Sequence, residues 1–87
     1  LLLIFHYNYM PYIPKEIRKE LENRNPQNPG ELNYLFTKIA LQYIGDKGEK
    51  YQHYNDILGA LEGCKLEMYR QQCSPYEDVK IKENGMV

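Results

Sequence analysis

Apolar residues recur at the spacing of one helix face between residues 31 and 44, and this is the strongest structural signal in the chain. They are Leu32, Leu35, Phe36, Ile39 and Tyr43. Side chains three and four residues apart lie on the same side of an α-helix, so this spacing predicts a helix over 31–44 with one apolar face. Glu31 in the first turn suits the positive end of the helix dipole, and Gly45 is the predicted stop.

A second and longer helix is predicted over about 50–73. Its apolar positions are Tyr54, Ile57, Leu58, Leu61, Leu66 and Met68. The turn residues at 46–48 separate the two predicted helices, so we expect an antiparallel helical hairpin. Gly59 and Gly63 lie four apart on one side of the second helix, each at a cost of up to about 1 kcal/mol relative to alanine. Close approach of another helix, or room for a ligand, would explain them.

The two ends of the chain are less regular. Residues 15–23 alternate charges at helical spacing and predict a short exposed helix, and the prolines and asparagines of 24–30 predict a loop. Pro75 is expected to end or kink the long helix. After it, apolar and charged residues alternate over 79–82, which predicts a half-buried strand or an extended tail. The predicted fold is therefore mainly α: a hairpin with a short N-terminal helix and an extended C-terminal tail.

A chain of 87 residues fits a single domain. Its core is marginal at this size, and small domains often gain stability by assembling, so we expect a homo-oligomer. Residues 10–87 are the predicted domain, because Met10-Pro11-Tyr12-Ile13-Pro14 looks like a natural opening. Residues 1–9 are then a non-native or disordered extension. The alternative is an apolar arm that docks on a neighbouring subunit.

Charge and composition limit the kinds of partner that this chain is expected to bind. The formal net charge of −1 disfavours binding of long nucleic acids, which require a basic excess, but it allows a pocket for a small anion. The apolar run Leu1–Phe5 is too short to cross a bilayer, so no membrane partner is expected. His6 and His53 lack ligand-spaced neighbours, which predicts no metal and no cofactor. Cys64 and Cys73, nine residues apart on one helix, are predicted to be reduced thiols of a cytosolic protein.

The candidate ligand residues are tyrosines grouped with polar side chains. The chain has nine Tyr and no Trp, and tyrosine suits both protein interfaces and pocket walls. Aromatic faces accept nucleobases, and arginine and lysine suit phosphate. The predicted ligand-binding residues are Asn33, Tyr34, Tyr54, Asn55, Glu62, Lys65, Tyr69 and Arg70. In the alternative interpretation they form a protein interface, with salt bridges from Glu62 and Arg70 to a neighbouring helix.

Catalysis is poorly supported by the residue spacing. Glu62 and Glu67 are five apart and point about 140° apart on a helix, which does not suit a magnesium-dependent nucleotide hydrolase. Ser74 has no nearby histidine, and Cys73 lacks a histidine partner. The sequence therefore predicts no catalytic residue, with a metal-dependent hydrolase as the least favoured function.

Five segments form a pattern that covers most of residues 10–87. They are Met10–Pro14, Gly30–Leu35, Asn55–Glu62, Lys65–Arg70 and Pro75–Ile81. In this pattern the chain resembles a family of short tailed-bacteriophage proteins of uncharacterised function. The resemblance implies a viral protein acting in the host cytoplasm, and small phage proteins commonly act by binding.

The resemblance and the residues together lead to two binding hypotheses. In the first, a non-enzymatic phage accessory protein self-assembles through its long helix and sequesters a small nucleotide-type ligand, such as a bacterial immune signal, at its subunit boundaries. In the second, the same surface is an interaction module that inhibits a host or defence protein.

Overall fold

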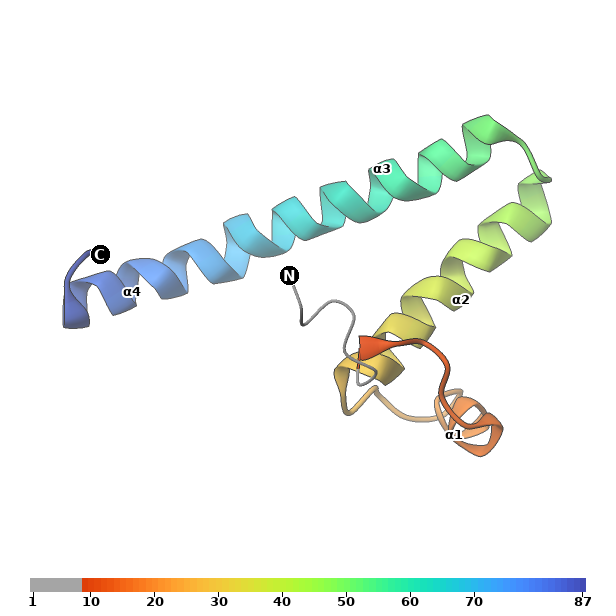
Figure 1. Ribbon diagram of the computed structural model, residues 1–87, viewed down its shortest axis with the longest axis horizontal. Helices are drawn as coiled ribbons and strands as arrows, with labels where there is room; N and C mark the ends of the chain where they lie inside the picture. Colours follow the sequence, from red (N-terminus) through yellow and green to blue (C-terminus); the bar gives the residue numbers. More distant parts are fainter. Residues whose placement is uncertain (1–8) are drawn as a thin grey trace. The chain divides into compact units, whose positions relative to one another are not determined.

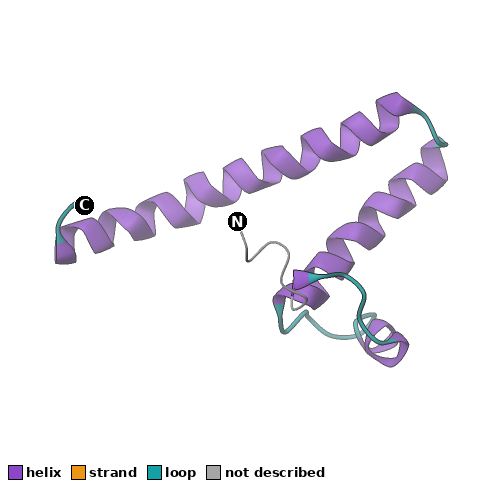
Figure 2. Ribbon diagram, in the orientation of Figure 1, coloured by secondary structure: helices purple, strands orange, loops and turns teal. Residues whose placement is uncertain are grey.

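The structure is a computed structural model that describes residues 9–87. The described residues are mainly α-helical and contain no strand (Figure 2), which confirms the predicted fold class. They fall into two units, one ending at Gly48 and one running from Glu49 to Val87. The predicted hairpin involves both units, and the predicted oligomer involves several copies of the chain. Both stay predictions. The prediction for residues 1–9 falls outside the described residues, Tyr9 excepted.

Helix α1 spans Lys15–Glu20 in the first unit and confirms the predicted short helix. Pro14 precedes it with φ −58°, a value that already suits a helix. The helix ends before the predicted residue 23, and the chain then passes through Leu21. Leu21 is only 6% exposed and is the one buried large apolar side chain among residues 9–87. The buried apolar side chain of the first unit therefore lies directly after α1.

Helix α2 spans Pro29–Lys47 (Figure 1), beyond the predicted 31–44 at both ends. At its start, Asn28 Oδ1 accepts a hydrogen bond of 2.9 Å from the Glu31 N–H, which caps the helix. The predicted stop at Gly45 is wrong, because the helix continues through it. The chain leaves the helix at Gly48, which has φ 94° and donates its N–H to the Ile44 carbonyl at 2.7 Å. Only glycine adopts this conformation without strain.

The second unit is one helical rod (Figure 1). It consists of α3 (Tyr51–Met68), the π-helical turn η3 (Tyr69–Cys73) and α4 (Ser74–Asn84). Helix α3 confirms the predicted start near residue 50. None of the three segments contains a buried residue. The described core therefore lies in the first unit.

The predicted C-terminal strand or extended tail is wrong. Residues 79–82 lie within α4. Pro75 occupies the first turn of α4, and the wider turn of η3 comes directly before it. Because a widened turn accommodates a missing N–H, the rod continues through Pro75. The alternation at 79–82 is too short to separate a strand from a helix, since Tyr76 and Val79 also have helical spacing.

Candidate functional site

A hollow of about 300 Å³ in the first unit gathers aromatic and cationic side chains. Tyr12 comes from the segment before α1, Arg18 from α1, and Tyr34 and Lys38 from α2. Tyr34 and Lys38 are four residues apart, so they share one face of α2. Pro11, Thr37 and Leu41 complete the lining. This site is called the Arg18 hollow below.

Arg18 is held in place from two sides. Its Nε donates a hydrogen bond of 3.0 Å to the Ile13 carbonyl. Its guanidinium carbon lies 5.5 Å from the centre of the Tyr34 ring, within the range of a cation–π contact. A guanidinium has five N–H donors, and among the described residues Ile13 is the one hydrogen-bond acceptor of Arg18. The remaining donors are available to a bound anion.

The positive charge of the Arg18 hollow has no acidic partner in the described part of the chain. Neither Arg18 nor Lys38 forms an ion pair there, and the lining contains no carboxylate. Four other cations do form such pairs: Arg24, Lys65, Arg70 and Lys80. Two uncompensated cations at one concave surface raise the local concentration of anions. The hollow is therefore suited to an anionic ligand.

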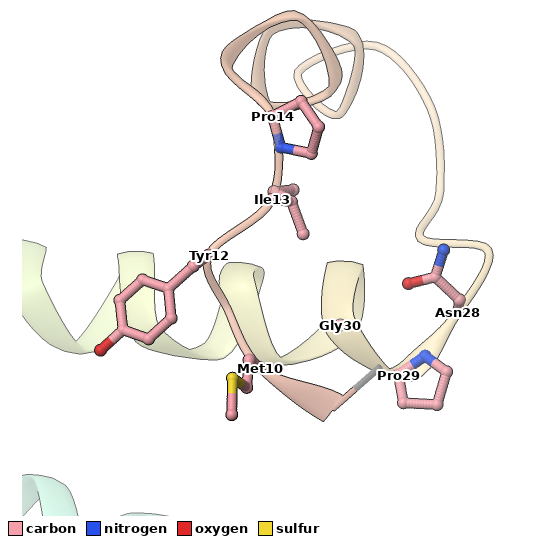
Figure 3. A pocket seen from close by; sticks show the side chains of 7 residues that line it. All are labelled: Met10, Tyr12, Ile13, Pro14, Asn28, Pro29 and Gly30. Atoms are coloured by element: carbon pink, nitrogen blue, oxygen red, sulfur yellow. The ribbon is translucent and has the colours of Figure 1, made fainter. Parts of the chain in front are cut away.

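A second hollow, of about 450 Å³, shares Tyr12 with the first. Figure 3 shows Met10, Tyr12, Ile13 and Pro14 along the segment before α1, and Asn28, Pro29 and Gly30 at the start of α2. The Tyr12 side chain is 83% exposed, so its ring is open to a ligand. This second lining carries no charged side chain. It suits the uncharged part of a ligand rather than its phosphate.

Of the two predicted ligand residues in the first unit, Tyr34 lines the Arg18 hollow and Asn33 does not. The Asn33 Nδ2 group donates to the Tyr9 carbonyl at 2.7 Å, and its Oδ1 accepts from the Thr37 hydroxyl at 3.0 Å. Both ends of this amide are thus bonded within the protein. Asn33 holds the segment before α1 against α2, and so supports the hollow from outside its lining.

Glu31, in the same sequence cluster, has a structural role. Its carboxylate accepts two hydrogen bonds from Arg24, at 2.8 and 3.2 Å, and one from the Gln27 N–H at 2.9 Å. Glu31 is only 7% exposed. The bonds from Arg24 and then Gln27 lower the pKa of Glu31 from 4.5 to about 2, against the opposing effect of burial. This pair closes the loop between α1 and α2.

The six predicted residues in the second unit lie along the exposed rod, and most have partners there. Lys65 pairs with Glu62 at 3.7 Å, and Arg70 with Glu67 at 3.5 Å. Both pairs lie within the rod, and the predicted salt bridges of Glu62 and Arg70 to a neighbouring helix stay a prediction. Asn55 is exposed. The structure therefore arranges these residues in pairs along α3 and η3.

The two predicted tyrosines of the rod donate to carboxylates. Tyr54 donates to Glu49 and Tyr69 to Glu77, each at 2.6 Å. These hydrogen bonds raise the pKa of both phenols. The hydroxyls are therefore held as donors, and the ring faces are left to contact a ligand or another helix.

Six of the seven lining residues of the Arg18 hollow were not predicted from the sequence, and three of them carry its aromatic and cationic groups: Tyr12, Arg18 and Lys38. Lys38 carried a usable signal, because it lies one helical turn after a predicted ligand tyrosine. Tyr12 and Arg18 carried none. Their approach to α2 depends on the path of the loop between α1 and α2, which spacing along a helix does not encode.

Residues 9–87 lack two further features that would bear on the site. These residues contain no group of three or more His, Cys, Asp or Glu side chains that could hold a metal ion. The same residues include no helix with the length and apolar character needed to cross a membrane.

Comparison with known proteins identifies the family. Residues 10–87 match the model of the family described as "Domain of unknown function (DUF6899)", and the chain belongs to this family. A search of the curated proteins found no match, and neither did a search of the solved structures.

Proposed function

We propose that this protein binds a small nucleotide-type anion without catalysing a reaction, and that the anion binds in the Arg18 hollow. The observation that supports this is that two tyrosine rings and two cations surround one concave surface, and that neither cation forms an ion pair with another residue of 9–87. The proposal keeps the ligand class that the sequence predicts. It moves the principal site from the long helix to the first unit.

The chemistry of the lining matches the two parts of a nucleotide. The planar fork of Arg18 suits two phosphate oxygens, and Lys38 adds a point charge. The exposed ring of Tyr12 offers a stacking face, and base–aromatic stacking contributes about 1–3 kcal/mol per base. A hollow of about 300 Å³ is at the lower end of the range for ligand pockets, which favours a single nucleotide unit.

The same lining supports binding rather than turnover. Its seven residues include no His, Cys, Asp or Glu, the side chains that most often act as general bases or nucleophiles. With the resemblance to phage proteins, this favours sequestration. The protein would act in the host cytoplasm by lowering the concentration of a nucleotide signal.

Calorimetric titration of the full chain with AMP, a cyclic dinucleotide and ADP-ribose tests the proposal. The informative variant is Lys38→Gln, which removes one charge from the hollow. A hydrogen bond to a charged group contributes about 1.5–3 kcal/mol, so we expect Kd to rise about tenfold or more. Lys19→Gln is the matched control, because Lys19 is exposed on α1 and does not line the hollow. We expect it to bind like the parent.

Two results would refute this assignment. A folded sample that gives no heat with any of the three ligands would exclude the ligand class. Binding weakened by Arg70→Gln but unchanged in Lys38→Gln would move the site to the second unit, where the sequence placed it.

A second candidate function, a protein-interaction module, rests on a separate observation. The rod of α3, η3 and α4 has no buried residue, although many of its side chains are apolar. A module that inhibits a host protein through this face predicts a stable complex of fixed stoichiometry with one purified host protein. Leu61→Glu would abolish that complex.

A further inference from the structure

The second unit lacks a core of its own, and this is the starting observation. Its three segments contain 18, 5 and 11 residues, and none of them is buried. Helices in proteins owe most of their stability to packing of an apolar face rather than to intrinsic propensity. The rod therefore requires a surface that covers one side of it.

One line of residues marks that side. Starting at Tyr54, the steps along the line are 4, 3, 4, 3, 4, 4, 3 and 4 residues, the spacing of a coiled-coil seam with one inserted step of four. The inserted step coincides with η3. The seam residues are Tyr54, Leu58, Leu61, Lys65, Met68, Gln72, Tyr76, Val79 and Glu83. The six apolar residues among them are 41–65% exposed.

The seam is nearly symmetric about its middle, and this near-symmetry points to a second copy as its partner. Reversing the helix about the point between Met68 and Tyr69 carries eight of the nine seam positions onto seam positions, and Met68 onto the neighbouring Tyr69. Apolar residues then meet apolar residues and polar residues meet polar ones, except that Tyr54 meets Glu83. The facing pairs are Tyr54 with Glu83, Leu58 with Val79, Leu61 with Tyr76, Lys65 with Gln72, and Met68 with Tyr69.

We propose that residues 51–84 pair antiparallel with the same segment of a second copy of this chain, in the register that places Leu61 opposite Tyr76. In that register the Glu83 carboxylate faces Tyr54, whose hydroxyl would exchange its acceptor Glu49 for Glu83 when the pair forms. A parallel pair in register would instead place Lys65 against Lys65 and Glu83 against Glu83. Like charges in a seam oppose pairing, so charge selects the antiparallel arrangement.

The length of the rod is sufficient for a stable pair. At about 1.5 Å per residue it is about 51 Å long, and a helix with side chains is about 10–12 Å across. Half of the side of such a cylinder is about 800–950 Å², close to the roughly 800 Å² that each partner contributes to a standard interface. Two copies therefore cover each other without a further chain.

The oligomeric state of the full chain in solution is the first test. Sedimentation equilibrium is expected to show twice the 10.4 kDa of the monomer. Leu61→Glu removes two seam leucines from each pair, so the dimer dissociation constant is expected to rise about 100-fold or more. Leu66→Glu is the matched control. Leu66 is 59% exposed but lies about 120° round the helix from Tyr54, and its variant should stay dimeric.

The register has its own test. Tyr76→Lys alone should also weaken the dimer, whereas the double variant Leu61→Glu with Tyr76→Lys should restore it, because each new carboxylate faces a new ammonium.

The relative direction of the two helices is measured by pulsed electron paramagnetic resonance. Single nitroxide labels are placed in a chain whose exposed Cys64 and Cys73 are changed to Ser. Labels at position 60 should be separated along the axis by about 26 Å, and labels at 71 by about 8 Å.

Each alternative outcome overturns the proposal. Equal and short distances at both positions would show a parallel pair. A double variant no stronger than the single variants would refute the register. A wild-type chain that stays monomeric at 0.1 mM would show that the seam is covered by the first unit or by a different protein.

Discussion

The Arg24–Glu31 pair makes the first unit sensitive to acid. In the folded chain the pKa of Glu31 is lowered from 4.5 to about 2, first by the hydrogen bond from Arg24 and then by the Gln27 N–H. In the unfolded chain both partners are lost and the ordinary value returns. Stability from this pair is therefore fully present above about pH 4.5 and is lost as the pH falls towards 2. Near pH 3.3, the midpoint, the unfolded chain holds about 0.9 more protons at this site.

Urea unfolding followed by circular dichroism, repeated from pH 5 to pH 2.5, measures that proton difference as the slope of stability against pH. Near pH 3.3 we expect the free energy of unfolding to rise more steeply with pH in the parent than in Glu31→Gln. The difference between the two slopes should correspond to about 0.9 bound proton. Glu16→Gln is the control, since Glu16 is exposed and belongs to no ion pair among the described residues. Should Glu31→Gln fail to fold, the carboxyl carbon of Glu31 can be titrated by NMR in the parent. A midpoint near 4.5 in that titration would refute the reasoning.

Two further predictions concern single residues. Asn28→Ala removes the side-chain cap of α2 and is expected to destabilise the first unit by about 0.5–2 kcal/mol; an unchanged urea midpoint would contradict this. Gly59→Ala is expected to stabilise the rod by up to about 1 kcal/mol, because an added Cβ meets nothing within 4 Å. A lower thermal midpoint of that variant would instead show that another helix packs closely on this side, as one interpretation of the Gly59 and Gly63 spacing predicts.

The sequence located both long helices but not their ends, and the reason is physical. The spacing of apolar residues reports which side of a helix is covered, and this signal is strong between Leu32 and Tyr43. Helix ends depend instead on single backbone positions. Gly45 and Gly48 are the same residue type, so the residue type alone does not tell which of them ends the helix. Of the two, only Gly48 has a positive φ, of 94°. Pro75 likewise reads as a break, whereas the turn before it widens and the helix continues.

The candidate site was predictable only in part for a related reason. Tyr34 was predicted because it is a tyrosine next to a polar side chain, Asn33, at the start of the first long helix. Tyr12 and Arg18 are held near α2 by two sets of contacts. Arg24 bonds to Glu31 across the loop between α1 and α2, and Asn33 bonds to Tyr9 in the segment before α1. Helical periodicity contains no information about such contacts. A candidate site built from two helices and the segment before α1 therefore required the structure.

Local interactions along the rod do not account for a helix that runs from residue 51 to residue 84. Its three ion pairs at i,i+3 spacing involve side chains that are 48–79% exposed. Each contributes about 0.2–0.5 kcal/mol, whereas Gly59 and Gly63 each cost about 0.8–1.0 kcal/mol. In the pair that we propose, burial of the apolar seam would supply the difference. Tyr54 and Tyr69 contribute to that seam or face its partner, so a ligand on these rings would compete with pairing, whereas the lining of the Arg18 hollow contains no residue of the rod.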